Sequence, residues 1–414
     1  MLRALALITL VVLCTGKVLA MPIVRPTTPP SLAVEVVDGE KVYRLPVAPT
    51  PLVQSRNIPL TIVDDPVNQW MGGTRLPALV IPPNNAIVAG AVRPGSVVVR
   101  PGPEGAPYVA GRDYQVDDKW AGLWRLPEGH VPAGANCFVD YDFYLSRMDT
   151  VQIGPSGRPT LRRGKPAVVC PHPAGPAAGA KALANIWVRW GATTITAEDI
   201  YPIGRPDPLP AADPALVPKT RALLAAGKPV KIVFLGDSVT CGGDASRPEY
   251  AFPALFVTRL SERFPQAQVT GVNAGIGGTN SDLGLQRLDK DVIAHHPDLV
   301  VIEFINDFGF PREKILENYR QLVTRLRAGG AEVVILTPHF IWPEWMGGYQ
   351  AALAALLEAA AANKVAVAHG SARWAALKAQ GIPYQTMLVN CINHPDDRGH
   401  ALFVDALMEL FPKE

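Results

Sequence analysis

The stretch KIVFLGDSVTCGG, Lys231 to Gly243, is a short apolar run that passes directly into Gly-Asp-Ser. An apolar run of this length that ends at glycine is typical of a buried strand followed by a turn. Two interpretations are open. The first is a strand with an ordinary turn after it. The second is a strand whose carboxyl edge presents Ser238 as a nucleophile, and the residues that follow the other strands decide between them.

Helical patterns alternate with further apolar runs in this half of the chain. In the clearest helix, Glu313–Gly330, apolar residues recur every three or four positions before a glycine pair. Strands that alternate with helices predict a parallel sheet covered on both faces, and ligands of such sheets bind beyond the carboxyl ends of the strands. The other predicted strands are Gln268–Ala274, Leu299–Phe304, Ala331–Pro338 and Val365–Gly370.

Polar segments follow these strands at that edge and carry the residue types of acyl transfer. A serine hydroxyl needs a base to remove its proton, and His394 is the candidate base. Attack on an ester leaves negative charge on oxygen, which fixed N–H donors stabilise. Gly278, Asn306 and the backbone N–H of Ser238 are suitable donors. The segments are GDS, NAGIGGTNS (residues 273–281), INDFG (305–309) and NCINHPDDRGHALFVDAL (390–407).

The blocks GDSVT, NAGIGG, IND and NHPDDRGH resemble, in this order, the four blocks of the SGNH hydrolases, also called GDSL-type esterases. The resemblance covers roughly residues 231–410. It implies a three-layer α/β/α, flavodoxin-like catalytic domain that hydrolyses esters without a cofactor. It marks Ser238 as nucleophile and His394 as base, with Ser238, Gly278 and Asn306 forming the oxyanion hole.

The sequence departs from the family pattern at two positions. Phe304 stands where the family often has glycine, which we expect to narrow the substrate pocket. Cys391 stands where the family usually has the aspartate that orients the base. The candidates for orienting the His394 ring are a backbone carbonyl or the side chains of Asn390, Asn393 and Asp307.

A second histidine, His400, follows the glycine of the last block and is interpreted as structural. Asp397 does precede it by three residues, as an orienting aspartate would. His394 remains the preferred base. The missing aspartate before His394 also leaves open a decayed enzyme that only binds its ligand.

The length of 414 residues predicts two domains. Residues 21–203 form a predicted β-rich, sandwich-like domain, residues 204–218 a proline-rich linker and residues 219–414 the catalytic domain. Within Asn136–Ile153, apolar residues alternate with polar ones, which predicts a half-buried strand. Asp140 and Asp142 are expected on its solvated face rather than in a metal site.

The first twenty residues combine Arg3, a short apolar run and small residues up to Ala20. This pattern predicts a secretory signal peptide over residues 1–20, and hence a secreted or periplasmic protein with no stable membrane span after cleavage. A lipoprotein site at Cys14 is the alternative. The formal net charge is +2 and basic runs are missing from the sequence, so nucleic acid is not an expected partner.

Four cysteines follow the predicted signal peptide, and their spacing gives no reason to expect a metal site. Cys241 lies three residues after Ser238, and Cys391 lies three residues before His394. If the serine and histidine meet, these cysteines are also brought close. We therefore consider a Cys241–Cys391 disulfide that would anchor the histidine loop, with free thiols or pairing with Cys137 or Cys170 as the alternatives.

These observations predict an exported serine esterase that removes O-acyl groups, most plausibly O-acetyl groups, from carbohydrate. The alternatives are a lipid or thioester acyl hydrolase and a non-catalytic carbohydrate-binding relative. The aromatic segment Thr337–Met346 follows the fourth strand. Its side chains are expected either to line a sugar-sized pocket or to cover the core.

Overall fold

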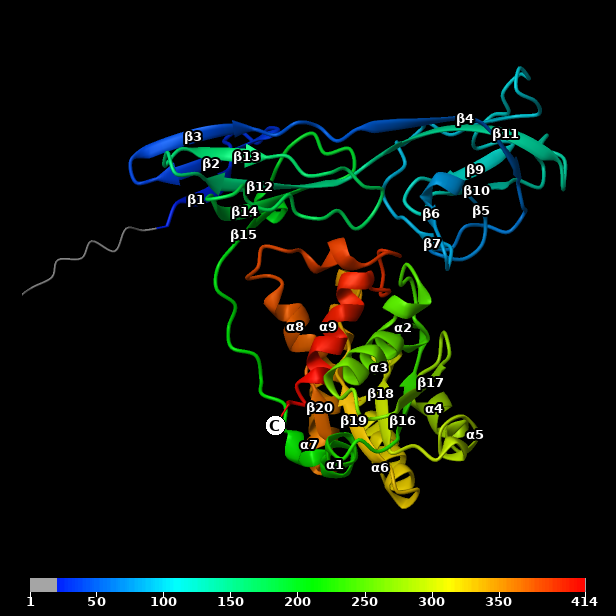
Figure 1. Ribbon diagram of the computed structural model, residues 1–414. Coiled ribbons are helices and arrows are strands. Elements are labelled where there is room, and N and C mark those ends of the chain that lie inside the picture. Colours follow the sequence, from blue (N-terminus) through cyan, green and yellow to red (C-terminus); the bar gives the residue numbers. More distant parts are fainter. Residues whose placement is uncertain (1–20, 414) are drawn as a thin grey trace, which may run out of the picture.

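A computed structural model describes residues 21–413, so the predicted signal peptide lies outside the described residues. Figure 1 shows a β-rich N-terminal region lying across one end of an α/β domain. Within residues 21–413, no helix is long and apolar enough to cross a membrane.

The α/β domain is built on a five-stranded parallel sheet with the strand order β17-β16-β18-β19-β20. Each strand falls on one of the five apolar runs, so the predicted parallel sheet is confirmed. The strands are β16 (Val230–Gly236), β17 (Val269–Gly275), β18 (Leu299–Glu303), β19 (Glu332–Leu336) and β20 (Ala366–Ala368).

Alternate residues of each strand face opposite layers of helices. Ile232 and Phe234 of β16 pack in the core beneath α3 and α9, whereas Val233 and Leu235 pack in the core beneath α6 and α7. The predicted three-layer α/β/α architecture is therefore confirmed. The helices are α1 (Pro218–Ala225), α2 (Ser238–Cys241), α3 (Phe252–Arg263), α4 (Ser281–Gln286), α5 (Leu288–Asp291), α6 (Arg312–Ala328), α7 (Met346–Ala362), α8 (Gly370–Ala376) and α9 (Asp397–Met408).

The N-terminal region is β-rich, as predicted, and its sheets are antiparallel. One core lies between the sheet β1-β2-β3 and the sheet β13-β12-β14-β15. A second core holds the remaining strands. The strands are β1 (Ile23–Pro26), β2 (Ala33–Asp38), β3 (Lys41–Pro46), β4 (Leu52–Thr61), β5 (Thr74–Arg75), β6 (Val80–Ile81), β7 (Ala86–Ile87), β8 (Val98–Arg100), β9 (Tyr114–Asp117), β10 (Gly122–Arg125), β11 (Asn136–Tyr144), β12 (Arg147–Ile153), β13 (Pro159–Arg162), β14 (Lys181–Val188) and β15 (Ile200–Pro202).

The stretch Asn136–Ile153 forms two strands rather than one. β11 and β12 belong to different sheets, and between them Ser146 pairs with Ala167. The expected solvated face is also wrong at Asp142, which is only 2% exposed. Its carboxylate binds the guanidinium groups of Arg56 at 2.7 Å and Arg93 at 3.0 Å, which compensates for burying the charge.

The two parts of the chain are joined by direct contacts as well as by the connecting segment. The Gly204 N–H donates to the Ala379 carbonyl at 2.7 Å, and the Asn185 amide donates to the Gly381 carbonyl at 2.9 Å. Between β15 and α1 the chain is extended except for a short 3₁₀ helix, Pro214–Leu216. The domain boundaries given above remain predictions. Figure 1 shows that the β-rich region covers the end of the sheet from which α2 projects.

Candidate active site

Ser238 begins α2, directly after β16 ends, so it lies at the carboxyl edge of the sheet. A Cβ at Gly236 would overlap Thr240 and the Glu303 carbonyl, so the strand can end this close to its neighbour only with glycine. Asp237 caps the helix by accepting from the Val239 N–H at 3.0 Å. Its other oxygen accepts from the Asn306 N–H at 3.1 Å, which ties the serine turn to the segment after β18.

The structure brings Ser238 and His394 together and adds Asp244 to them. His394 Nε2 lies 2.9 Å from Ser238 Oγ, and His394 Nδ1 lies 2.8 Å from Asp244 Oδ2. Because a carboxylate accepts, the proton is on Nδ1 and the lone pair of Nε2 faces the serine hydroxyl. This geometry is that of a nucleophile, a general base and an orienting acid.

Asp244 was not among the predicted orienting groups, and it comes from the turn after α2 rather than from the histidine loop. Its side chain is only 2% exposed, and its backbone is left-handed, with φ of 59°. A Cβ at the preceding Gly243 would crowd the Ser238 carbonyl and the His394 ring. The sequence Gly242-Gly243-Asp244 was the available signal for this orienting acid. Two glycines allow a tight turn that brings the following carboxylate back toward Ser238.

The three residues proposed to orient His394 have other partners. Asn390 Oδ1 accepts the backbone N–H groups of Ile392, Asn393 and His394, each at 2.9 Å, so it shapes the loop rather than the ring. The side-chain oxygen of Asn393 accepts from the Asn390 amide at 3.1 Å. Asp307 accepts from the Ser281 N–H at 2.9 Å.

The considered Cys241–Cys391 disulfide is wrong, because both cysteines are free. Cys241 is exposed on α2 and lines a cavity beside Ser238. Cys391 has a left-handed φ of 59° and packs against the core of the N-terminal region. The loop is therefore anchored by burial, and that burial raises the pKa of the Cys391 thiol to about 11. Cys137 and Cys170 are free as well.

Gly278 and Asn306 line a cavity of about 550 Å³ together with Ser238 and His394. One N–H of the Asn306 amide donates to the Thr279 carbonyl at 2.9 Å, which fixes the amide beside the serine. The other N–H of that amide is then available to a ligand. Ser238, as the first residue of α2, also has a backbone N–H without an intrahelical acceptor.

Phe304 does not narrow this cavity. It is 2% exposed, lies in the core beneath α6 and α7, and contacts Gly284 of α4. Its ring fills the space that a Cβ at Gly284 would need. The expectation that it shapes the substrate pocket is therefore wrong.

His400 is structural in its contacts. It is completely buried, its Nδ1 accepts from the Phe252 N–H at 3.3 Å, and its Nε2–H donates to the Gly243 carbonyl at 3.2 Å. Burial lowers the pKa of His400 to about 4, so the ring is neutral at neutral pH. Through Gly243 it supports the turn that carries Asp244.

Three buried carboxyl groups lie beneath the site. Burial raises the pKa of Asp237 to about 6 and that of Asp307 to about 7. Burial, reinforced by the nearby Asp237 charge, raises the pKa of Glu303 well above its usual range. Glu303 accepts a hydrogen bond from the Thr240 hydroxyl at 3.0 Å. A neutral Glu303 avoids a second buried charge next to Asp237.

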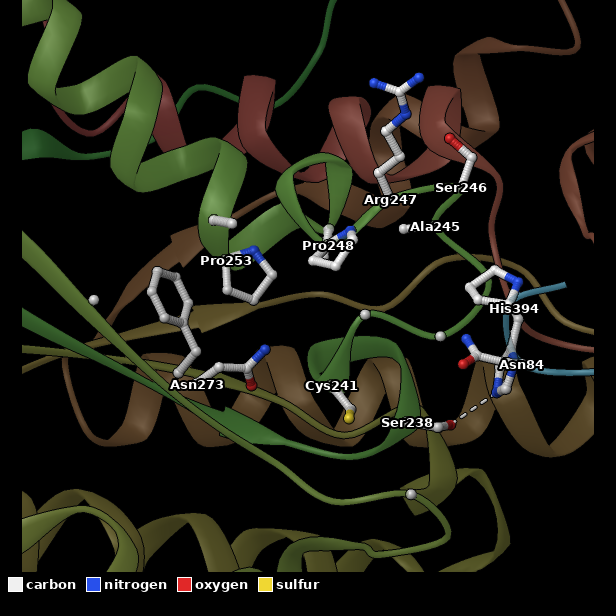
Figure 2. A pocket seen from close by; sticks show the side chains of 18 of the residues that line it. Asn84, Ser238, Cys241, Ala245, Ser246, Arg247, Pro248, Pro253, Asn273 and His394 are labelled. Carbon is white, nitrogen blue, oxygen red and sulfur yellow. Dashed lines mark hydrogen bonds between the residues drawn. The ribbon is translucent and has the colours of Figure 1, made fainter.

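A second cavity, of about 840 Å³, is also lined by Ser238 and His394. Figure 2 shows Ser238, His394 and Asn84 at one end of it, with Cys241 and Asn273 in its wall. Within the described residues, no group of three or more His, Cys, Asp or Glu side chains is arranged to hold a metal ion.

Comparison with known proteins gives matches to the α/β part of the chain. Residues 234–402 match the family model of the GDSL-like lipase/acylhydrolase family. An arylesterase from Vibrio mimicus is 35% identical over 109 residues, which are 26% of this chain and 53% of the relative. An acetylxylan esterase from Geobacillus stearothermophilus is 32% identical over 136 residues, covering 28% of this chain and 62% of the relative.

Among solved structures, a two-domain esterase (CEX) active on acetylated mannans is 28% identical, with a TM-score of 0.42 over 48% of this chain and 53% of that chain. The chain thus spans about half to three-fifths of the length of these relatives. The matched residues 234–402 contain Ser238, Asp244, Gly278, Asn306 and His394. Through residues 234–402 of its α/β part, the chain is thus similar to the GDSL-like lipase/acylhydrolase family, and the β-rich N-terminal region lies outside this match.

Proposed function

We propose that this protein is an exported serine esterase that hydrolyses O-acyl esters, chiefly O-acetyl esters, on carbohydrate. The observation that carries the proposal is the hydrogen-bonded chain from Ser238 Oγ through His394 to Asp244, at 2.9 and 2.8 Å. The matches to an arylesterase and an acetylxylan esterase support the same reaction class. Export rests on the predicted signal peptide, which implies a secreted or periplasmic location.

In the proposed reaction, Ser238 Oγ attacks the ester carbonyl while His394 Nε2 takes the hydroxyl proton. Asp244 stabilises the imidazolium through Nδ1–H. The oxyanion accepts hydrogen bonds from the N–H groups of Ser238 and Gly278 and from the Asn306 amide.

When the tetrahedral intermediate collapses, the C–O bond to the alcohol breaks and His394 returns the proton to the leaving oxygen. Water then attacks the acyl-serine with His394 again as base. This second step releases the carboxylic acid and restores the Ser238 hydroxyl.

The experiment compares the full chain with its Ser238→Ala variant on p-nitrophenyl acetate. The variant is expected to lose on the order of 10⁵–10⁶ in turnover, as for other catalytic serines. Ser261→Ala, on the far part of α3, is the matched control because its hydroxyl only bonds the Val257 carbonyl of its own helix. Wild-type turnover in the Ser238→Ala variant would reject the serine mechanism, and an inactive wild type would favour the carbohydrate-binding alternative.

Two further measurements test the substrate class. Comparing acetyl with octanoyl p-nitrophenyl esters separates a deacetylase from a lipid or thioester hydrolase. Acetate release from acetylated xylan, mannan, pectin and peptidoglycan then identifies the polymer. A preference for octanoyl esters would contradict the deacetylase proposal.

A further inference from the structure

The cavity of about 550 Å³ that holds the serine–histidine pair is not formed by the α/β domain alone. The α/β domain contributes Ser238 and His394 to its lining. The N-terminal region contributes two further segments to its lining, one of which carries Trp70 and the other Asn84 to Ile87. The β-rich region is therefore part of the candidate active site and not a separate attachment.

The segment that carries Asn84 to Ile87 is a short hairpin, and its tip reaches the catalytic groups. Val80 of β6 pairs with Ile87 of β7, and the base of the hairpin is buried in the N-terminal core. The tip, Pro82–Asn85, is exposed. Asn84 lines both cavities, and Figure 2 shows its side chain next to His394. Asn85 has a left-handed φ of 58°, a conformation that asparagine adopts more readily than most residues. The residue at the tip therefore fits the backbone conformation of the turn.

The other segment holds Trp70 on a turn closed by hydrogen bonds. The N–H and carbonyl groups of Asn68 and Met71 bond each other at 2.9 and 3.0 Å, which closes the turn around the tryptophan. The Arg75 guanidinium donates to carbonyls of the same turn and to the Trp120 carbonyl. A side chain at Gly72 would overlap the Pro66 carbonyl. The chain thus fixes this loop while it leaves the indole 42% exposed.

An exposed indole held in place beside a nucleophile is suited to a ligand with a flat apolar face. Trp70 packs edge-on against Trp345, with the ring centroids 5.8 Å apart. Trp345 in turn stacks on Phe308 at 5.4 Å with an angle of 14° between the rings. All three rings line the cavity, so it has an aromatic wall built from both parts of the chain.

The polar groups of the same cavity are mostly carboxamides. Asn84, Asn85, Asn306, Asn390 and Asn393 line it. Of the described residues in this lining, Asp244 and His394 are the only acid and base, and they are bonded to each other. An aromatic wall with neutral hydrogen-bonding groups fits sugar rings, whose faces are apolar and whose edges carry hydroxyls. It offers no cation for the carboxylate of an acidic sugar.

We propose that the N-terminal region supplies a subsite for a neutral sugar chain, with Trp70 as the stacking surface and Asn84 and Asn85 as partners of sugar hydroxyls. The inference rests on the proposed esterase function and adds the class of sugar and the residues that hold it. The sugar unit next to the ester lies against Trp70, and the ester carbonyl lies at Ser238.

The kinetic test uses the full chain and its Trp70→Ala variant. The KM for acetylated xylo- or manno-oligosaccharides is expected to rise about tenfold, as for the loss of an aromatic anchor, and kcat/KM should fall more for these oligosaccharides than for p-nitrophenyl acetate. Trp70→Phe should recover much of the loss. Met71→Ala is the matched control, because its side chain is on the same turn and 56% exposed. It should leave both substrates unchanged.

The binding test uses the Ser238→Ala protein, which cannot turn substrate over, and isothermal titration with xylohexaose, mannohexaose and hexagalacturonate. At least one neutral chain is expected to bind, the acidic chain is not, and adding Trp70→Ala should abolish the binding. Three results would overturn the subsite: no neutral chain binds, the acidic chain binds equally well, or Trp70→Ala lowers octanoyl ester hydrolysis as much as oligosaccharide hydrolysis. Each is distinct from failure of the esterase proposal, which Ser238→Ala alone decides.

Discussion

Asp244 and His394 are 150 positions apart in the chain, yet Asp244 Oδ2 accepts from His394 Nδ1 at 2.8 Å. Asp244 is six residues after Ser238, so the nucleophile and the acid belong to one short segment of the chain, α2 and the turn after it. The base comes from a different segment, the loop before α9. This arrangement replaces the aspartate that the family pattern places three residues before the histidine, where this chain has Cys391.

Asp244→Asn is expected to lower kcat on p-nitrophenyl acetate on the order of 10³-fold or more, because an amide that donates to Nδ1 holds the ring in the wrong tautomer. Asp397→Asn is the control. Asp397 accepts from Ser246 at 2.6–2.8 Å and stands three residues before His400, so it tests the rival acid–histidine pair. Unchanged kcat in Asp244→Asn would show that the ring is oriented by another group.

His394→Ala and His400→Ala should differ in kind. The first removes the base and should abolish turnover without lowering the melting temperature. The second leaves a cavity and strips the Phe252 N–H and Gly243 carbonyl of their partner, which should cost roughly 2–4 kcal/mol of stability. Circular dichroism melting and initial rates below the melting transition separate the two effects. A stable, inactive His400→Ala protein would reverse the assignment.

Asn306→Ala is expected to reduce kcat by about 10²–10³-fold with little change in KM, because its amide is proposed to meet the oxyanion only as charge develops. Asn363→Ala is a suitable control, since Asn363 bonds the Ala359 carbonyl at the end of α7. The measurement is steady-state kinetics on p-nitrophenyl acetate. A rise in KM alone would assign Asn306 to ground-state binding instead.

Glu303→Gln tests the buried carboxyl group beneath the serine. Because the pKa of Glu303 in the folded protein is raised well above its ordinary value of 4.5, folding keeps a proton that the unfolded chain releases. Its contribution to stability is therefore full below about pH 4.5 and is lost as the pH rises toward the folded-state pKa. In that window the wild type should lose up to about 1.4 kcal/mol per pH unit relative to the Gln variant.

Urea unfolding from pH 4 to pH 8 measures this difference in slope. Glu262→Gln, at an exposed position of α3, is the control and should follow the wild type. Parallel curves for wild type and Glu303→Gln would mean that Glu303 is ionised in the folded protein.

The sequence was most informative about the parallel sheet. Runs such as Lys231–Leu235 are apolar on both faces because helices cover both sides, and their ends carry glycine or polar residues. Ser238 and His394 were predicted for the same reason, since the carboxyl ends of parallel strands meet at one edge, and the structure places them 2.9 Å apart.

The predictions that failed for residues 136–153 depend on partners far away in the sequence. The break between β11 and β12 depends on the pairing of Ser146 with Ala167, and the burial of Asp142 depends on two arginines more than 40 residues away. Local alternation carries no information about such partners. The predicted candidates for orienting His394 were a backbone carbonyl, Asn390, Asn393 and Asp307, whereas the structure supplies Asp244 from a left-handed turn that follows Ser238.

Ile392, two residues before His394, is 4% exposed and buried in the core of the N-terminal region. Apart from Ile392, the buried residues of that core lie between Ile62 and Phe143. They are synthesised long before the histidine loop. The N-terminal residues that contact the histidine loop are thus already synthesised when the loop itself is made. The loop that carries His394 therefore takes its position against residues that lie about 250 positions or more earlier in the chain.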